Sequence, residues 1–175
     1  MNNSFVHLHA HTEYSMLDGA AKITDYLKKV KELNQPAAAI TDHGNLYGAL
    51  EFVRQAESLD IKPIIGYEAY VTPGSRFDRP DRDNNKRYHL TLLAENDIGY
   101  QNLVELVSKA YLEGFYYKPR VDYQLLSEHA EGIIALSGCL GGKVAQHLAP
   151  DGSKEEGNIK NEKSYKKALE KAKNY

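Results

Sequence analysis

The 175-residue sequence has a single cysteine, no tryptophan and no long apolar run. One cysteine cannot form a disulfide within the chain, so the fold must depend on packing, and a reducing, cytoplasmic compartment is expected. No stretch approaches the roughly 18 apolar residues of a membrane span. The first residues, Met1–His7, lack the basic start and apolar stretch of a signal peptide. These absences argue against a secreted disulfide-rich domain and against a membrane protein.

A large excess of charge of either sign is also absent. The chain carries 22 Lys and Arg against 24 Asp and Glu, a net charge of −2 at pH 7. This balance excludes a uniformly basic nucleic-acid coat, but it permits a local basic groove because binding responds to the field at the site. With 42% hydrophobic and 26% charged residues, the composition is typical of one soluble globular domain.

The hydrophobic pattern alternates between strand and helix periodicity. It predicts strands at 5–11, 37–41, 62–71, 88–94 and 133–136, and helices at 22–33, 46–59, 97–112 and 123–130. This alternation is typical of an α/β fold with a parallel sheet, open or closed into a barrel.

The C-terminal part of the chain differs in composition from the rest. Residues 151–175 are polar and Lys-rich and include a possible solvated helix over 161–175. A β/α barrel usually needs about 200 residues or more. We therefore expect residues 1–150 to be the N-terminal portion of a truncated barrel domain, and 151–175 to lead into its missing remainder.

Histidines give the strongest chemical signal. His7, His9 and His11 alternate with apolar residues, so the predicted strand places all three imidazoles on one face. Apolar burial does not explain that face, whereas a bound metal ion does. The alternative is a solvated edge strand whose histidines are simply hydrogen-bonded.

Other ligand-type residues lie on or after further predicted strands. His43 directly follows one strand, Glu68 lies within the next, and Cys139 follows the last. Because loops at the C-terminal strand ends meet at one face of β/α folds, these side chains are expected to converge. Asp18 is either a bridging carboxylate or the Asp of an Asp-Gly turn. His89 begins its strand, so topology alone makes it a weaker candidate.

The mixture of donors indicates the metal and the chemistry. Nitrogen and oxygen ligands suit zinc or manganese, and a thiolate favours zinc without excluding iron. The donors outnumber the needs of one tetrahedral ion, so we expect a cluster of ions, an arrangement used for phosphoester hydrolysis. Gly138, Gly141 and Gly142 either leave amides free for a phosphate or form a tight turn.

Two further segments have the composition of nucleic-acid contacts. The loop over 72–87 contains four arginines and a lysine among aspartates, and is either a solvated loop or a basic patch. The aromatic and basic residues of 111–120 either stack on a single strand or pack against a neighbouring domain.

Seven short segments carry a resemblance to a known family. Over residues 4–147 the sequence resembles the PHP (polymerase and histidinol phosphatase) domain at the N-terminus of bacterial DNA polymerase III alpha subunits. The matching segments are Phe5–Ser15, Leu17–Ala20, Thr41–Asn45, Ile61–Gly66, Gly99–Leu103, Ala110–Gly114 and Leu136–Cys139.

The resemblance implies a distorted, TIM-like β/α barrel with a divalent metal cluster of zinc, manganese, iron or magnesium. Two further family ligands, an Asp and a His near the end of the domain, have no counterpart before Tyr175. His7 stands where the family often has another polar residue. The implied ligands, with no separate catalytic residue, are His9, His11, Asp18, His43, Glu68, His89 and Cys139.

The same resemblance implies a function for the parent protein, the catalytic alpha subunit of a replicative DNA polymerase. Its PHP domain would be a metal-dependent 3′–5′ exonuclease acting on the primer 3′ end, and the isolated fragment would be inactive. The implied partners are DNA, the rest of the polymerase chain and other replisome subunits, and no membrane. The alternatives are a structural metal-binding module that docks a proofreading subunit, and a free-standing PHP phosphatase.

Overall fold

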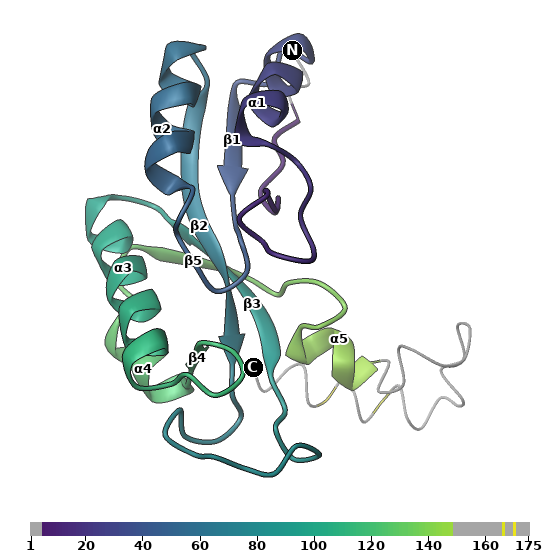
Figure 1. The fold of residues 1–175 in the computed structure, drawn as a ribbon, viewed down its shortest axis with the longest axis vertical. Coiled ribbons are helices and arrows are strands. Elements are labelled where there is room, and N and C mark those ends of the chain that lie inside the picture. The colour runs from purple at the N-terminus through teal and green to yellow at the C-terminus, as the bar shows by residue number, and fades with distance from the viewer. Residues whose placement is uncertain (1–4, 149–165, 167–169, 171–175) are drawn as a thin grey trace.

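The computed structural model describes residues 5–148 together with Lys166 and Glu170, and it is a mixed α/β fold (Figure 1). The α/β class expected from the sequence is confirmed. The helix predicted over 161–175 lies outside the described residues except for Lys166 and Glu170. The elements in chain order are α1 (Ile23–Glu32), β1 (Ala37–Ile40), α2 (Ala49–Ser58), β2 (Lys62–Val71), β3 (Tyr88–Ala94), α3 (Asp97–Leu112), β4 (Arg120–Val121), α4 (Tyr123–Glu128), β5 (Ile133–Leu136) and α5 (Lys143–Leu148).

The described sheet has the strand order β1-β2-β3-β5, with β4 also pairing with β2. Strand β1 runs parallel to β2, as predicted, and so does β4, a strand that the sequence did not predict. Strand β3 is antiparallel to both β2 and β5. The expectation of a wholly parallel sheet is therefore wrong. Two consecutive strands can pair in parallel only if a crossover connection, usually a helix, joins them. The loop over 72–87 that joins β2 to β3 contains no helix.

The N-terminal segment also differs from its prediction, because residues 5–11 form no regular strand. They run beside β1, where Ala39 N donates to His7 O at 3.2 Å and Thr41 N donates to Ala10 O at 2.9 Å. Ala10 N, however, donates to the side-chain Oγ1 of Thr41 at 2.8 Å. A side chain thus takes the place of a main-chain acceptor, and the ladder is interrupted.

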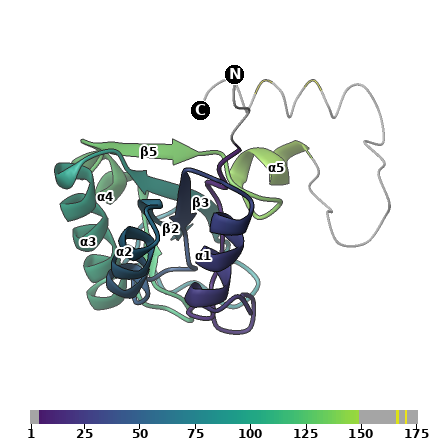
Figure 2. The same cartoon turned by 90° about the horizontal axis from the view of Figure 1, so that it is seen from above.

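Two groups of buried apolar residues hold the helices on the sheet. Ile23, Leu27 and Val30 on α1 pack with Phe52 and Ala56 on α2, because the helical spacing of these residues creates one apolar face on each helix. The second group joins α3 and α4 to the far half of β2 and to β3. Seen from above, α3 and α4 gather at one side of the molecule and α1 at the other (Figure 2).

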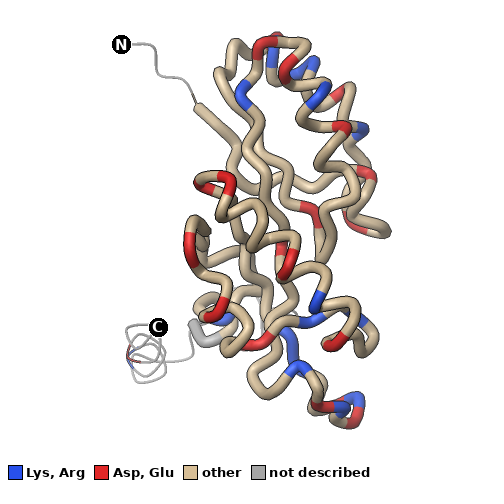
Figure 3. Tube along the Cα trace, turned by 90° about the vertical axis from the view of Figure 1, so that its left-hand side faces the viewer, with Lys and Arg blue, Asp and Glu red and all other residues tan. Residues whose placement is uncertain are grey.

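Charged residues of both signs are spread over the surface, and Lys and Arg are interspersed with Asp and Glu at the lower end of the molecule (Figure 3). Among the described residues, no helix combines the length and apolar character needed to cross a lipid bilayer.

Candidate metal centre

The centre is built around Glu68 of β2, whose side chain is fully buried. Its Oε2 lies 2.6 Å from His9 Nε2 and 2.5 Å from His11 Nε2. Its other oxygen, Oε1, lies 2.7 Å from His89 Nδ1. A carboxylate carried by the longest strand of the described sheet is therefore surrounded by imidazoles from two other parts of the chain.

Asp18 and His43 extend this group on one side. Asp18 Oδ2 contacts His11 Nδ1 and lies 3.3 Å from His43 Nε2. The other ring nitrogen, His43 Nδ1, is 3.8 Å from Glu68 Oε2. That nitrogen is buried and has no hydrogen-bond partner in the part of the chain that the structure describes.

Cys139 closes the opposite side of the group. Its Sγ lies 3.4 Å from both Glu68 Oε1 and His89 Nδ1, and it accepts a hydrogen bond from Gly141 N at 3.3 Å. Gly142 N donates to Cys139 O at 2.8 Å, and Gly138 has a φ of +83°. The glycines therefore form a tight turn that positions the thiol, and the amides of Gly141 and Gly142 are occupied within it.

The electrostatics of the group favour an ionised carboxylate at its centre. Burial raises the pKa of Glu68, but hydrogen bonds from His11, His89 and His9 outweigh burial and lower it overall. The hydrogen bond to Glu68 raises the pKa of His11, whereas burial lowers the pKa of His43. An ionised carboxylate without exposure to water needs a positive partner, which can be imidazolium or a metal ion.

The donor set fits divalent metal ions. Three overlapping triads have ligand atoms that lie within 4.8 Å of one another. Among the described residues, the buried Nδ1 of His43 has no hydrogen-bond partner and lies 3.8 Å from Glu68 Oε2. Carboxylate oxygens and imidazole nitrogens are the usual donors to zinc and manganese. The triads are His9, His11 and Glu68; His11, Asp18 and His43; and His43, Glu68 and His89.

The seven side chains that the family resemblance implies as ligands thus meet at one place. Two other histidines lie elsewhere. His7 packs its ring on Phe5, with 4.8 Å between ring centroids, and joins none of the triads. His129 Nδ1 lies 3.2 Å from Asn102 Oδ1.

Asp42 supports the candidate centre from behind and was not predicted from the sequence. Its buried carboxylate accepts hydrogen bonds from Thr12 N at 2.6 Å, Thr12 Oγ1 at 2.7 Å and Ser15 Oγ at 2.6 Å. Ser15 Oγ in turn accepts a hydrogen bond from His43 N at 3.0 Å. Asp42 therefore fastens the loop that follows His9 and His11 to the loop that carries His43. The available signal was an acidic residue at a buried strand end, directly before a predicted ligand.

The loop over 72–87 offers less free basic charge than its composition indicates. Arg76 is buried and pairs with Glu113 (Nε to Oε2, 2.6 Å) and with Asp122 (Nη1 to Oδ1, 3.2 Å). Arg79 donates through Nη1 to Arg76 O at 3.0 Å and through Nη2 to Glu113 O at 3.1 Å. These two arginines fix the loop to the end of α3 and the start of α4.

Comparison with known proteins adds an independent finding. The model of the PHP domain family matches residues 7–175. DNA polymerase III alpha subunits of three bacteria are 58% identical over 151 residues (Thermus aquaticus), 55% over 152 (Deinococcus radiodurans) and 53% over 154 (Treponema pallidum). These alignments cover 84%, 82% and 87% of this chain. The chain spans only 12%, 11% and 13% of the respective relatives.

Solved structures give a weaker similarity. A candidate metal-dependent phosphoesterase from Bifidobacterium adolescentis aligns with a TM-score of 0.45 at 17% identity, covering 62% of this chain and 33% of that protein. An amidohydrolase from Chromobacterium violaceum aligns with a TM-score of 0.44 at 22% identity, covering 60% of this chain and 32% of that protein.

Proposed function

This chain belongs to the PHP domain family, and from that premise we propose that it is the N-terminal portion of the PHP domain of a bacterial replicative DNA polymerase alpha subunit. Identity of 53–58% to such subunits over more than four fifths of the chain supports this proposal. In this proposal residues 1–150 form the first part of the domain, and residues 151–175 lead into its remainder.

We further propose that the domain is a metal-dependent phosphoesterase that removes nucleotides from a mispaired 3′ end. The observation that carries the proposal is the convergence on Glu68 of donors from separate parts of the chain. When bound, divalent ions supply charge stabilisation for phosphoryl oxygens and an activated water. Zinc, manganese, iron and magnesium are the candidate ions. The residues proposed to hold them are His9, His11, Asp18, His43, Glu68, His89 and Cys139.

The chain's own residues have distinct roles in this proposal. Glu68 offers one oxygen to each side of the cluster, because Oε2 faces His9 and His11 whereas Oε1 faces His89. Asp18 joins His11 to His43 through one carboxylate oxygen. Asp18 is half exposed, so it lies where a phosphodiester arriving from solvent would meet the centre. Residues fixed in advance at such a site lower the cost of orienting the substrate.

The second candidate function is structural. The same donors hold the N-terminal loop, β2 and the Cys139 turn together, and metal binding contributes directly to folding free energy. In this alternative the metals brace the polymerase and the domain docks a separate proofreading subunit. A free-standing phosphatase is less well supported, because the relatives reported above are polymerase subunits.

The deciding experiment uses the full-length polymerase subunit that carries this chain, loaded with manganese or zinc, and measures nucleotide release from a mismatched primer. His9→Ala and His43→Ala should abolish release but leave primer extension intact. His129→Ala is the matched control, because its ring lies outside the cluster. Release that survives both cluster substitutions contradicts the exonuclease proposal. Absent release in the wild type, with a lowered melting temperature in the variants, supports the structural alternative.

A further inference from the structure

A strained aromatic turn projects beside the metal centre. Tyr116 N donates to Lys118 O at 3.1 Å, and the two residues bridge across Tyr117. Tyr117 has a φ of +60° and is 67% exposed. The left-handed region is unfavourable for a bulky side chain, and glycine would occupy it more easily. Burial therefore does not explain why a tyrosine occupies the tip of this turn.

The turn is held firmly against the walls of the centre. Arg120 of β4 pairs in register with Tyr70 of β2, two residues beyond Glu68. A Cβ on Gly44 would lie 2.9 Å from Pro119 Cγ and 3.1 Å from the Tyr70 ring, so the turn packs tightly on the loop that follows His43. The buried Arg120 side chain also donates to three main-chain oxygens, those of Gly114 (3.0 Å), Arg76 (2.9 Å) and Asp78 (2.7 Å).

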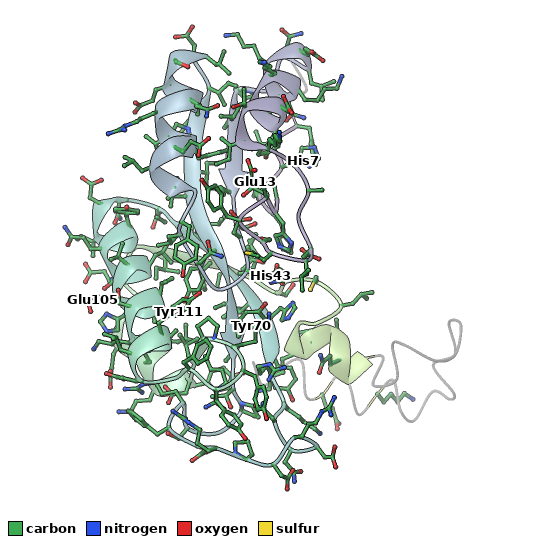
Figure 4. All side chains as sticks on the ribbon, in the orientation of Figure 1. His7, Glu13, His43, Tyr70, Glu105 and Tyr111 are labelled. Carbon is green, nitrogen blue, oxygen red and sulfur yellow. The ribbon has the colours of Figure 1, made fainter. Side chains whose placement is uncertain are left out.

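Lys118 places a positive charge close to the centre. Its Nζ lies 5.5 Å from the centroid of the Tyr70 ring. Tyr70 stacks on His43, with 5.7 Å between ring centroids and 14° between ring planes, and Figure 4 shows the two side by side. Within residues 5–148, Lys118 forms no ion pair with a carboxylate. One aromatic ring thus separates an exposed, unpaired ammonium group from the candidate metal ligands.

We propose that the Tyr117–Lys118 turn binds single-stranded nucleic acid at the metal centre. Lys118 contacts a backbone phosphate, and the Tyr117 ring stacks on a base. This combination of a cation with an exposed aromatic is the usual means of binding a single strand without sequence preference. Phe115 is 51% exposed and lies near Tyr111, with 6.1 Å between ring centroids and 24° between ring planes, which offers a second stacking surface.

This inference rests on the proposed phosphoesterase function and names the residues that would hold its substrate strand. A small phosphomonoester that carries no base, such as a sugar phosphate, has no group to stack on an exposed tyrosine. A polynucleotide gains both a phosphate contact and a stacking contact next to the bond to be broken.

The test is photo-crosslinking of the full-length protein to a single-stranded oligonucleotide that carries 5-iododeoxyuridine at its 3′ end, with EDTA present to prevent hydrolysis. Mass spectrometry should find the crosslinked peptide that contains Tyr117. Titration of the oligonucleotide gives an apparent dissociation constant for crosslinking to residues 115–118, where Phe115 and Tyr116 remain as aromatic acceptors when Tyr117 is replaced. Stacking is worth about 1–3 kcal/mol per base, so Tyr117→Ala should weaken this constant by roughly ten-fold. Tyr100→Ala is the matched control, because Tyr100 is 44% exposed on α3.

The contribution of Lys118 is measured in the same assay as the salt dependence of the binding constant. Each phosphate contact to a single strand contributes about 0.7 to the slope of log K against log salt concentration. Lys118→Ala should therefore reduce that slope by about 0.7, and Lys118→Arg should retain it. Lys29→Ala, an exposed substitution on α1, should leave the slope unchanged.

Tyr117→Gly separates binding from folding, because glycine relieves the left-handed backbone. Its melting temperature should hold or rise while crosslinking falls. Absence of a crosslink near Tyr117, or a fall in melting temperature without a change in crosslinking, overturns the inference. Crosslinking at Tyr117 in a protein that releases no nucleotide leaves the inference standing and refutes the exonuclease proposal. Nucleotide release without this crosslink overturns the inference and leaves the exonuclease proposal standing.

Discussion

His89 is the second residue of strand β3, yet its Nδ1 lies 2.7 Å from Glu68 Oε1 on the neighbouring strand β2. The antiparallel pairing of the two strands explains this position, because the first residues of β3 lie beside the last residues of β2. A residue at the start of a strand thus reaches the same end of the sheet as residues near the ends of parallel strands. A position near the start of its strand therefore does not make His89 a weaker candidate ligand in this fold.

Glu68→Gln should weaken the binding of manganese or zinc to the metal-stripped protein by at least ten-fold. Even residues behind the ligands change metal affinity by about 10–100-fold, and the substitution removes the charge that faces both sides of the proposed cluster. Isothermal titration calorimetry measures the effect. Glu105→Gln, an exposed change on α3, is the control (Figure 4). Unchanged affinity in the Glu68 variant would exclude Glu68 as a ligand.

Asp42→Ala should lower the free energy of unfolding by about 2–3 kcal/mol, because three hydrogen bonds to a buried carboxylate lose their acceptor. Urea denaturation measures the change. Glu57→Ala, on the exposed face of α2, should stay within about 0.5 kcal/mol of the wild type. Equal effects of the two substitutions would show that Asp42 does not hold the loop.

Acidification should release the contact between Asp122 and the loop over 72–87. Burial raises the pKa of Asp122, but hydrogen bonds from the amides of Arg76 and Leu125 and the Arg76 charge lower it overall. A depressed folded-state pKa means that the stabilisation is complete above the unfolded-state pKa of about 4. It is lost as the pH falls through the lower folded-state value. The difference in unfolding free energy between the wild type and Asp122→Asn should therefore shrink from pH 6 to pH 3.

Glu32→Gln is the control for this titration. Its carboxylate also has a lowered pKa, because of Lys29, but the pair lies exposed on α1 and contributes little to stability. If the difference in unfolding free energy between the wild type and Asp122→Asn stays constant over the same pH range, ionised Asp122 does not stabilise the contact with the loop.

Removal of metal should destabilise the protein. An ion at 100 times its dissociation constant stabilises the folded state by about 2.7 kcal/mol, so EDTA should lower the melting temperature relative to saturating manganese or zinc. Differential scanning calorimetry on the wild type and on His9→Ala with His43→Ala measures the effect. A full metal-dependent shift that persists in the double variant would place the bound ion elsewhere.

Strong periodicity made several elements predictable from the sequence. The strand at 62–71 and the helix at 97–112 were predicted with the bounds that the structure gives them. The strand at 5–11 was wrong because the Thr41 side chain competes for the amide of Ala10, and local periodicity contains no such competitor. The two-residue strand β4 is too short to produce any period.

The residues of the candidate site could be predicted from the sequence, but the contacts that position them could not. His9 stands out because it alternates with apolar residues, and His43 and Cys139 stand out as donor types that follow apolar runs. The direction of β3, which brings His89 to the same place, depends on a long loop whose path the composition does not determine. The role of Asp42 depends on contacts with residues about 30 positions away, which a single sequence does not reveal.

The long sequence separations around Glu68 also set an order of events during synthesis. His9 precedes Glu68 by 59 residues, and Cys139 follows it by 71. A growing chain therefore carries the first imidazoles long before it carries their carboxylate partner, and the thiol emerges last. Because domains generally fold as units during synthesis, the seven donors described here can assemble only after Cys139 has left the ribosome. An ion captured earlier by the histidines of the nascent chain would have to be re-coordinated as the sheet closes around it.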